Sequence, residues 1–187
     1  RALVEQGIDA AGVDVSEWAV INADDAVRDR IRTIYSEDQV GWYSGLTDLA
    51  QGIRYDWIVA KDVLEHLGSP SETLSALCRA ARCGVFLVIP VADRDGGPYG
   101  DPRAERDVTH HVRWTGEKWL RVVAESAARA AGPKSAPFTV DLTWRIPGIK
   151  DHVAQSAPFG YAFIRARRRV PRFVIAMTAY RASAWLG

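Results

Sequence analysis

Short apolar runs alternate with amphipathic segments along this sequence, and two of the runs end at or near an acidic residue, Asp14 or Asp62. The clearest run is residues 55–60, which includes three consecutive large apolar residues and is followed by Lys61 and Asp62. A continuous apolar run of this length is typical of a strand that is buried on both faces of a parallel sheet. Strands that alternate with helices predict an α/β domain. We therefore expect one domain over residues 1–187, with a mainly parallel sheet between layers of helices.

The bounds of the expected elements follow from capping residues and apolar spacing. Ser16, Ser69 and Thr115 are suited to begin helices, because a hydroxyl can accept a hydrogen bond from a free backbone amide of the first turn. The predicted helices are residues 1–7, 17–33, 70–83 and 116–131, and the predicted strands are 8–15, 40–46, 55–60, 85–89, 138–146 and 172–180. Residues 92–107 have no periodicity and are rich in glycine and charge, which predicts a long loop over a pocket.

The charge balance limits the kind of partner. The chain has 24 basic and 23 acidic side chains, a net charge of +1, and this gives no overall field that attracts nucleic acid or an anionic membrane. The longest apolar stretch, residues 173–179, is far shorter than the roughly 20 residues that a membrane-spanning helix needs. We therefore expect no nucleic-acid partner and no membrane span, and a small molecule that is selected by a local site.

The two cysteines point to the cell compartment. Cys78 and Cys83 have no histidine or further cysteine at the spacing of zinc ligands, so a zinc site built on them is not expected. Two thiols in a chain of this size are typical of a reducing setting, and we expect a cytoplasmic protein.

Arginines are concentrated near the end of the sequence. They are Arg165, Arg167, Arg168, Arg169 and Arg172. Guanidinium groups match the geometry of phosphates and carboxylates. The cluster is therefore either a binding site for a phosphate or an acidic partner, or a charged loop between the last two strands.

Four segments carry a more specific pattern. They are GVDVSEWAV at residues 12–20, YDWIVAKDVLEHL at 55–67, CGVFLVIP at 83–90 and HVRWTGEKWLRVVAES at 111–126. In this order and spacing they resemble the class I S-adenosylmethionine-dependent methyltransferases, in the small-molecule subgroup whose fourth strand leads into a VLEHL sequence. The resemblance implies a Rossmann-like three-layer fold, in which the last two strands form an antiparallel pair that closes the sheet.

The resemblance implies S-adenosylmethionine as cofactor. The implied cofactor-binding residues are Asp14, Val15, Gly45, Leu46, Lys61, Asp62 and Val63. Asp14 would accept hydrogen bonds from the ribose hydroxyls, which suits a carboxylate because it can accept from two donors. The alternatives remain that Asp14 only helps to begin the next helix, that Gly45 and Leu46 form an ordinary turn, and that Asp62 is a helix N-cap.

Three histidines are candidates for a catalytic base. Methyl transfer to a hydroxyl requires removal of a proton, and an imidazole with a pKa near neutrality is suited to this step. His66 follows the expected strand 55–60, and His110 and His111 follow the long loop. We expect Glu65 to position the local helix rather than to act in catalysis.

The long loop also raises the question of a metal site. Its candidate ligands are Asp93, Asp95, Asp101, Asp107, His110 and His111. They have no fixed ligand spacing, and a solvated acidic loop explains them better than a metal site does. We therefore expect no bound metal.

One element of the resembled family is missing. The glycine-rich turn of the type E/D-x-G-x-G-x-G, which follows that family's first strand, has no match in this sequence. The first strand of that family, which precedes this turn, lies in the centre of the sheet. Its loss would expose two apolar edges of the sheet. We therefore expect an N-terminally truncated enzyme, and a polypeptide of these residues should fold poorly and bind the cofactor weakly.

Two functions of other classes remain open. A nicotinamide-dependent oxidoreductase also places an acid at the tip of its second strand, although the VLEHL and HVRWT segments have no place in that pattern. A non-catalytic domain that uses the methyltransferase fold as an interaction surface would also lack the glycine-rich turn.

Overall fold

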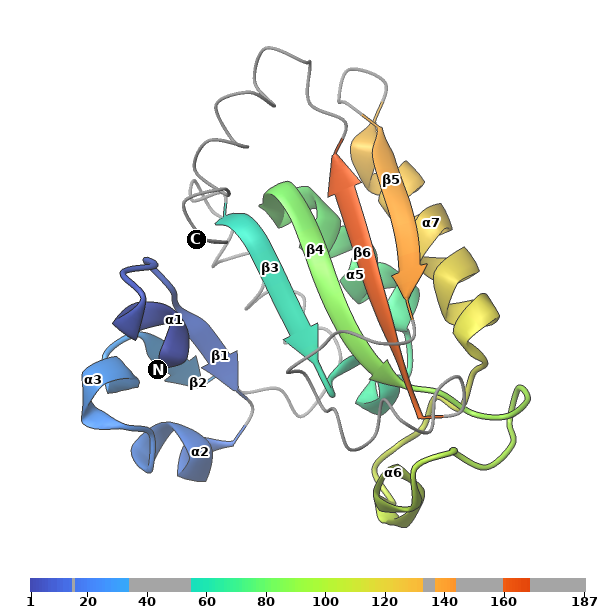
Figure 1. The fold of residues 1–187 in the computed structure, drawn as a ribbon, viewed down its shortest axis with the longest axis horizontal. Helices are drawn as coiled ribbons and strands as arrows, with labels where there is room; N and C mark the ends of the chain where they lie inside the picture. The colour runs from blue at the N-terminus through green and yellow to red at the C-terminus, as the bar shows by residue number, and fades with distance from the viewer. Residues whose placement is uncertain (15, 34–54, 133–136, 144–159, 169–187) are drawn as a thin grey trace. The chain divides into compact units, whose positions relative to one another are not determined.

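The computed structural model describes residues 1–14, 16–33, 55–132, 137–143 and 160–168 (Figure 1). The chain divides into two compact units, residues 1–51 and 52–187, and each is described by itself. In the described ranges, no helix has both the length and the apolar character needed to cross a membrane.

The first unit contains two short parallel strands and three short helices. These elements are α1 (Ala2–Glu5), β1 (Gly12–Asp14), α2 (Glu17–Ile21), α3 (Asp25–Arg28) and β2 (Ile31–Thr33). The strands β1 and β2 pair in parallel, with Gly12 opposite Ile31 and Asp14 opposite Thr33. Ser16 is the N-cap of α2 as expected, because its hydroxyl accepts a hydrogen bond from the amide of Ala19 at 3.2 Å.

The prediction of one helix over residues 17–33 is wrong. The helix ends at Ile21, and a second N-cap, Asp24, begins α3 by accepting a hydrogen bond from the amide of Ala26 at 3.0 Å. The last residues of the expected helix form β2 instead. Ile31 and Thr33 are β-branched, which favours a strand, and their pairing with β1 satisfies the backbone groups.

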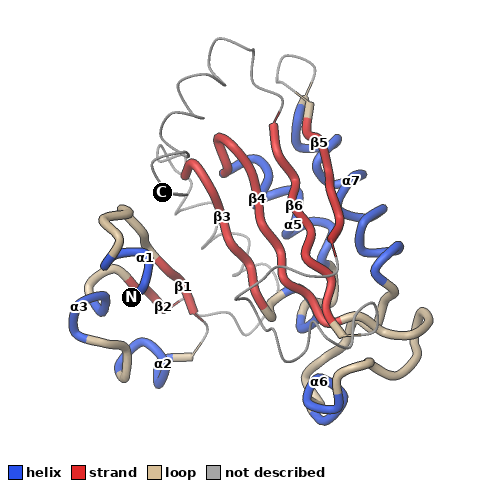
Figure 2. The backbone as a smooth tube through the Cα atoms, in the orientation of Figure 1, coloured by secondary structure: helices blue, strands red, loops and turns tan. Residues whose placement is uncertain are grey.

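The second unit has a four-stranded sheet with helices on one of its faces. Its strands are β3 (Tyr55–Lys61), β4 (Ala81–Pro90), β5 (Phe138–Thr143) and β6 (Tyr161–Arg168). They lie in the order β3-β4-β6-β5, with β3 and β4 parallel and the other two pairings antiparallel (Figure 2). The helices α5 (Pro70–Ala80) and α7 (Gly116–Ala131) lie together on one face of this sheet (Figure 1).

The core of this unit lies between the sheet and the two helices. Its fully buried side chains include Leu74, Cys78, Val85, Leu87, Trp119, Val123 and Ile164. Burial raises the pKa of the Cys78 thiol to about 11, as expected for a thiol that packs as an apolar side chain. Helix α7 matches its prediction, because Thr115 caps its start and Gly132, with φ 61°, follows its last residue.

Strand β3 forms as predicted, but its two faces differ in burial. Ala60 is buried, whereas Trp57 and Val59 are 44% and 60% exposed. Successive side chains of a strand point to opposite faces, so the apolar run of β3 supplies one buried face and one exposed face in the described structure. The prediction that this strand is buried on both faces is therefore wrong.

The boundary between α5 and β4 lies earlier than predicted. The helix ends at Ala80 and the strand begins at Ala81, so that Gly84 lies inside the strand and does not stop the helix. A Cβ at residue 84 would lie 2.6 Å from the carbonyl oxygen of Ala166 and 2.6 Å from Cζ3 of Trp57. Glycine is needed at this position because β4 passes close to β6 and to the Trp57 ring.

The arginine-rich segment is a strand and not a loop. Arg165, Arg167 and Arg168 belong to β6, which is the antiparallel partner of β5. Arg165 forms an ion pair with Asp141 at 3.0 Å, and Arg168 donates hydrogen bonds to the carbonyl oxygens of Ala81 and Cys78.

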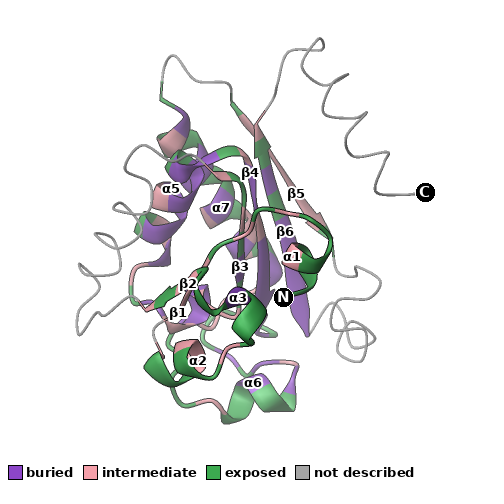
Figure 3. Cartoon of the chain, turned by 90° about the vertical axis from the view of Figure 1, so that its left-hand side faces the viewer, coloured by how far each residue is buried: buried purple, intermediate pink, exposed green. Residues whose placement is uncertain are grey.

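Some expected elements of the sequence fall in parts that are not described. These are the expected strands 40–46 and 172–180, Arg169 and Arg172. An antiparallel pair lies at the end of the sheet as the resemblance implies, but the partner of β5 is β6, a strand that the sequence does not predict. In Figure 3, β6 contains a long buried stretch, which continues the core across the sheet.

Substitution Gly84→Ala tests the close approach of β4 to its neighbours. The added methyl group should lower the free energy of unfolding by about 1–3 kcal/mol, the usual cost of overpacking a well-packed site. Gly12→Ala is the control, because a Cβ there would lie 3.6 Å from Ile31, an ordinary contact distance. Urea unfolding measures both changes, and a Gly84→Ala variant as stable as the parent would contradict this close packing of β4 against β6 and Trp57.

Candidate functional site

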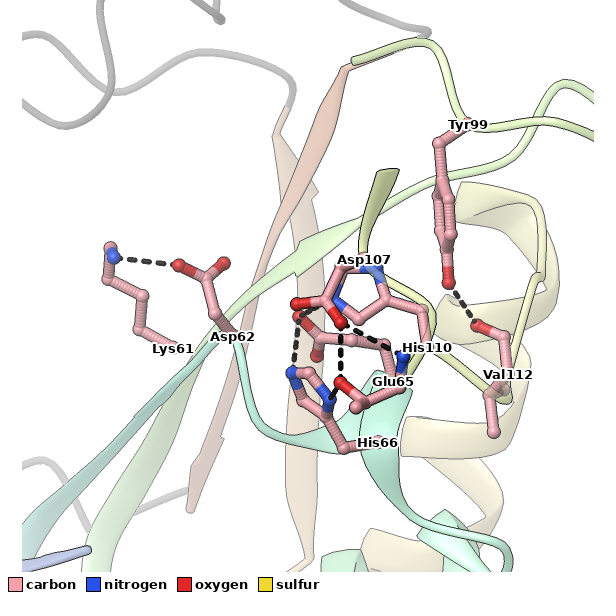
Figure 4. Close-up of polar contacts among 9 residues, drawn as sticks. Lys61, Asp62, Glu65, His66, Tyr99, Asp107, His110 and Val112 are labelled. Atoms are coloured by element: carbon pink, nitrogen blue, oxygen red, sulfur yellow. Dashed lines mark hydrogen bonds and ion pairs between the residues drawn. The ribbon is translucent and has the colours of Figure 1, made fainter. Parts of the chain in front are cut away.

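The candidate site begins where β3 ends. Asp62, the residue after the strand, has φ 53°, and its amide donates a hydrogen bond to the carbonyl oxygen of Val88 on β4 at 3.0 Å. Positive φ is uncommon outside glycine, and aspartate is one of the residues that tolerate it. The Lys61 ammonium group lies 2.8 Å from the Asp62 carboxylate (Figure 4). The backbone therefore turns sharply at the carboxyl edge of the sheet, where open α/β sheets bind ligands.

A one-turn helix after this bend carries Glu65. The helix η1 (Leu64–His66) places Glu65 fully inside the protein, with 0% of its surface exposed. The Glu65 carbonyl oxygen accepts hydrogen bonds from the amides of His111 at 2.8 Å and Val112 at 2.9 Å. These two bonds attach residues 107–112 to η1, although the two segments are far apart in the sequence.

The attached segment gives His66 a hydrogen-bonding partner. The hydroxyl of Thr109 donates to the Asp107 carboxylate at 2.5 Å and lies 2.8 Å from Nδ1 of His66. Because the single hydroxyl hydrogen is used on Asp107, Thr109 accepts from His66, and Nδ1 carries the proton. The other ring nitrogen, Nε2, then has a free lone pair for a proton or a metal ion.

His110 lies beside His66 and the two carboxylates (Figure 4). Its Nε2 atom is 3.5 Å from an oxygen of Asp107 and 3.9 Å from Oε1 of Glu65. Nε2 of His66 is 4.0 Å from the same Glu65 oxygen, and the two imidazole rings meet edge to face with 4.5 Å between their centres. Two imidazoles and two carboxylates therefore converge at one place.

Tyr99 closes one side of this cluster. Its ring centre lies 5.2 Å from that of His110, and its hydroxyl donates a hydrogen bond to the carbonyl oxygen of Val112 at 2.9 Å. The Arg113 guanidinium also lies against the Tyr99 ring, 4.9 Å from its centre. Burial raises the pKa of Tyr99 to about 12, so its hydroxyl stays a hydrogen-bond donor through the neutral range.

The surroundings favour a neutral His110. Burial lowers its pKa below the ordinary value, and the nearby His66 lowers it further, while the charge of Asp107 acts in the opposite direction. Asp107 itself has a lowered pKa, chiefly because the Thr109 hydroxyl and amide donate hydrogen bonds to it. The site therefore combines an ionised carboxylate with an uncharged imidazole at neutral pH.

The structure brings together two of the three predicted catalytic residues. His66 and His110 lie in the cluster, whereas the side chain of His111 is exposed and this residue contributes its backbone amide. The N-cap interpretation of Asp62 is wrong, since Val63 is the N-cap of η1. The catalytic and cofactor-binding roles of these residues stay predictions.

The predicted cofactor residues of the first unit are described in part. Asp14 ends β1 and is half-buried, and its Oδ1 atom accepts a hydrogen bond from the amide of Ser16 at 2.8 Å. This contact supports the start of α2, and a role of Asp14 toward a ribose stays a prediction. Val15, Gly45 and Leu46 lie outside the described residues.

Most acids of the long loop have structural partners. Asp93 pairs with Arg94, Asp95 pairs with Lys118 on α7, and Asp101 caps α6 (Pro102–Arg106) by accepting from the amide of Arg103. Asp107 alone of these four acids reaches the cluster of histidines. The loop is also more ordered than predicted, because it contains α6 and an antiparallel bridge between residues 92 and 99.

Sequence patterns do not reveal three residues of the site. The sequence indicates only a helix-positioning role for Glu65, and it does not single out Thr109 or Tyr99. Thr109 directly precedes two histidines, and this is a usable signal because a hydroxyl is a common hydrogen-bonding partner of an imidazole. Tyr99 has no such signal, because its place depends on how the loop folds back.

The pKa of His110 is open to direct measurement. Histidine ring signals in a pH titration by nuclear magnetic resonance should place it below the ordinary value of 6.5. Because the folded protein then favours the neutral ring, the contribution of His110 to the free energy of unfolding is fully present above about pH 6.5. This contribution is lost as the pH falls through the lower pKa of the folded state. The titratable groups around the ring are His66, Asp107, Glu65, Asp62 and Tyr99. A pKa above 6.5 would mean that the carboxylates outweigh the burial.

Comparison with known proteins places the fold. The sequence matches no protein-family model and no curated protein. Among solved structures, the chain is similar to the putative methyltransferase in complex with the Haloferax volcanii Trm112 methyltransferase activator. The two share 12% sequence identity with a TM-score of 0.53, and the match covers 91% of this chain and 77% of that one. It is also similar to the [4+2]-cyclase SpnF, with 18% identity, a TM-score of 0.52 and coverage of 91% and 71%.

These likenesses extend over nearly the whole chain, and they agree with the mixed α/β sheet and the antiparallel strands at its end. The four sequence segments predict the same arrangement. The chain therefore shares the Rossmann-like mixed α/β fold of these structures.

Proposed function

We propose that this chain acts in methyl transfer from S-adenosylmethionine to a small-molecule acceptor. The observation that carries the proposal is His66, whose Nδ1 is held by Thr109 and Asp107 and whose Nε2 has a free lone pair at the carboxyl edge of the sheet. The fold supports the class of reaction but does not decide it, because one similar structure is named a methyltransferase and another a [4+2]-cyclase.

The residues at the end of β3 suit the cofactor. When bound, S-adenosylmethionine supplies a methyl group on a positively charged sulfur. The carboxylate of Asp62 is half-buried at the bend, and such a group favours the positive charges of the methionine part. Lys61 and Val63 flank Asp62 and would line the same place. The assignment of Asp14 to the ribose belongs to the proposal as well, on the strength of the sequence resemblance.

His66 is the proposed base. A proton from the acceptor's hydroxyl or amine would pass to Nε2, while the Nδ1 proton stays hydrogen-bonded to Thr109. The resulting imidazolium would be stabilised by the carboxylate of Asp107 through Thr109 and by Glu65, whose Oε1 lies 4.0 Å from Nε2. His110 would fix the ring of His66 by edge-to-face contact.

Titration with S-adenosylhomocysteine tests the proposal, with backbone amide signals as the measurement. We expect weak binding, with a dissociation constant on the order of 1 mM, and shifts centred on residues 61–63. Asp62→Ala should weaken binding about tenfold or more, because a charged contact is lost. Asp56→Ala is the matched control, since Asp56 lies on the same strand and forms an exposed ion pair with Arg82.

The contrary result is equally clear. If a folded protein gives no shifts at saturating ligand, the cofactor proposal fails and a non-catalytic interaction domain becomes the better account. If shifts occur but Asp62→Ala has no effect on affinity, the cofactor lies elsewhere and the roles assigned to Lys61, Asp62 and Val63 fail.

A further inference from the structure

The cluster at the end of β3 holds three atoms that are suited to metal binding. Glu65, His66 and His110 each offer one ligand atom, and these three atoms all lie within 4.8 Å of one another (Figure 4). We propose that Glu65, His66 and His110 form a site for one divalent transition-metal ion of the zinc type. Glu65 and His66 are not among the ligand candidates that the sequence offers, whereas His110 is one of them.

The distances leave room for an ion between the three atoms. Oε1 of Glu65 is 3.9 Å from Nε2 of His110 and 4.0 Å from Nε2 of His66. Ligand atoms around a tetrahedral zinc ion, at bonds of about 2.1 Å, lie roughly 3.4 Å apart. Side-chain rotations that shorten these two separations by about half an ångström would bring the Glu65 oxygen and the two imidazoles to that spacing.

The ligand types agree with zinc chemistry. Two imidazoles and one carboxylate are a common set for zinc sites that keep a fourth position open. Imidazole nitrogen favours zinc and other later transition metals, whereas magnesium and calcium favour oxygen ligands. The site is therefore expected to prefer zinc over magnesium.

The hydrogen bonds behind His66 orient it for this role. A histidine that binds a metal usually donates its other ring N–H to an oxygen, which fixes the orientation of the ring. In this cluster Nδ1 of His66 donates to Thr109, which in turn donates to Asp107. The lone pair of Nε2 is thus available for a metal ion.

Charge and burial also favour a cation at this place. Asp107 adds a second carboxylate, with an oxygen 3.5 Å from Nε2 of His110. Glu65 is fully buried and the side chain of His110 is 7% exposed, so the local polarity is low and the attraction of a carboxylate for an ion is strong. His66, whose side chain is 32% exposed, leaves a path by which the ion can enter.

The metal site and the proposed base use the same atom of His66, so the two roles exclude each other in one molecule. A bound ion would occupy Nε2 of His66, so His66 could not act as a base in the metal-bound protein. Metal coordination lowers the pKa of a bound hydroxyl, and this effect would take the place of the base if an acceptor occupied the fourth position.

Calorimetric titration of zinc chloride into the chelator-treated full chain tests the site. We expect one ion per chain with a dissociation constant on the order of 1 µM or lower. His66→Ala, His110→Ala and Glu65→Gln should each weaken binding about 100-fold. Thr109→Val should weaken it about tenfold or more, since loss of a group that orients a metal ligand usually costs 10–100-fold. His111→Ala and Cys83→Ser are the controls and should bind zinc as the parent does.

Two results would overturn the inference. One is the absence of zinc binding by the folded parent, and the other is binding that persists unchanged in His66→Ala and His110→Ala. If these variants unfold, histidine ring signals of the parent protein decide the question. Stoichiometric zinc should then shift the nitrogen signals of His66 and His110 and leave those of His111 in place, and unshifted signals of His66 and His110 would refute the site.

Discussion

The candidate site depends on one backbone group, the carbonyl oxygen of Glu65, which accepts hydrogen bonds from the amides of His111 and Val112. Thr109, which is 43 positions after His66 in the sequence, reaches the His66 ring only because these bonds hold its segment against η1. His110 points into the cluster for the same reason. The side chain of Glu65 is buried at the same point, so this residue supplies both the attachment and a carboxylate of the site.

The fold was largely predictable where local signals and tertiary packing agree. β3 and α7 follow their apolar patterns, and the threonine cap of α7 forms as expected. The helix expected over residues 17–33 failed because a second N-cap and two β-branched residues act against its spacing. β6 was missed because its arginines suggest a loop, although Arg165 and Arg167 are exposed and Ala166 between them is buried, which is the alternation of a strand.

The site was predictable in its residue types but not in its arrangement. His110 and His111 are adjacent and chemically equal in the sequence, so only the path of the backbone decides which side chain enters the cluster. Glu65 could be recognised as part of the VLEHL sequence. Its burial and the two amides that donate to its carbonyl oxygen depend on contacts between distant segments. The bend at Asp62 also depends on a contact between distant segments, because its amide pairs with the carbonyl oxygen of Val88 on β4.

Amide hydrogen exchange tests the central claim most directly, because it reads the two bonds to the Glu65 carbonyl one residue at a time. If these bonds hold the segment against η1, the amides of His111 and Val112 exchange as slowly as those of the buried strand β4, while the amide of the exposed Val108 exchanges rapidly. If His111 and Val112 instead exchange as rapidly as Val108, the segment is not attached to η1, and the cluster of His66, His110 and Glu65 is not preformed.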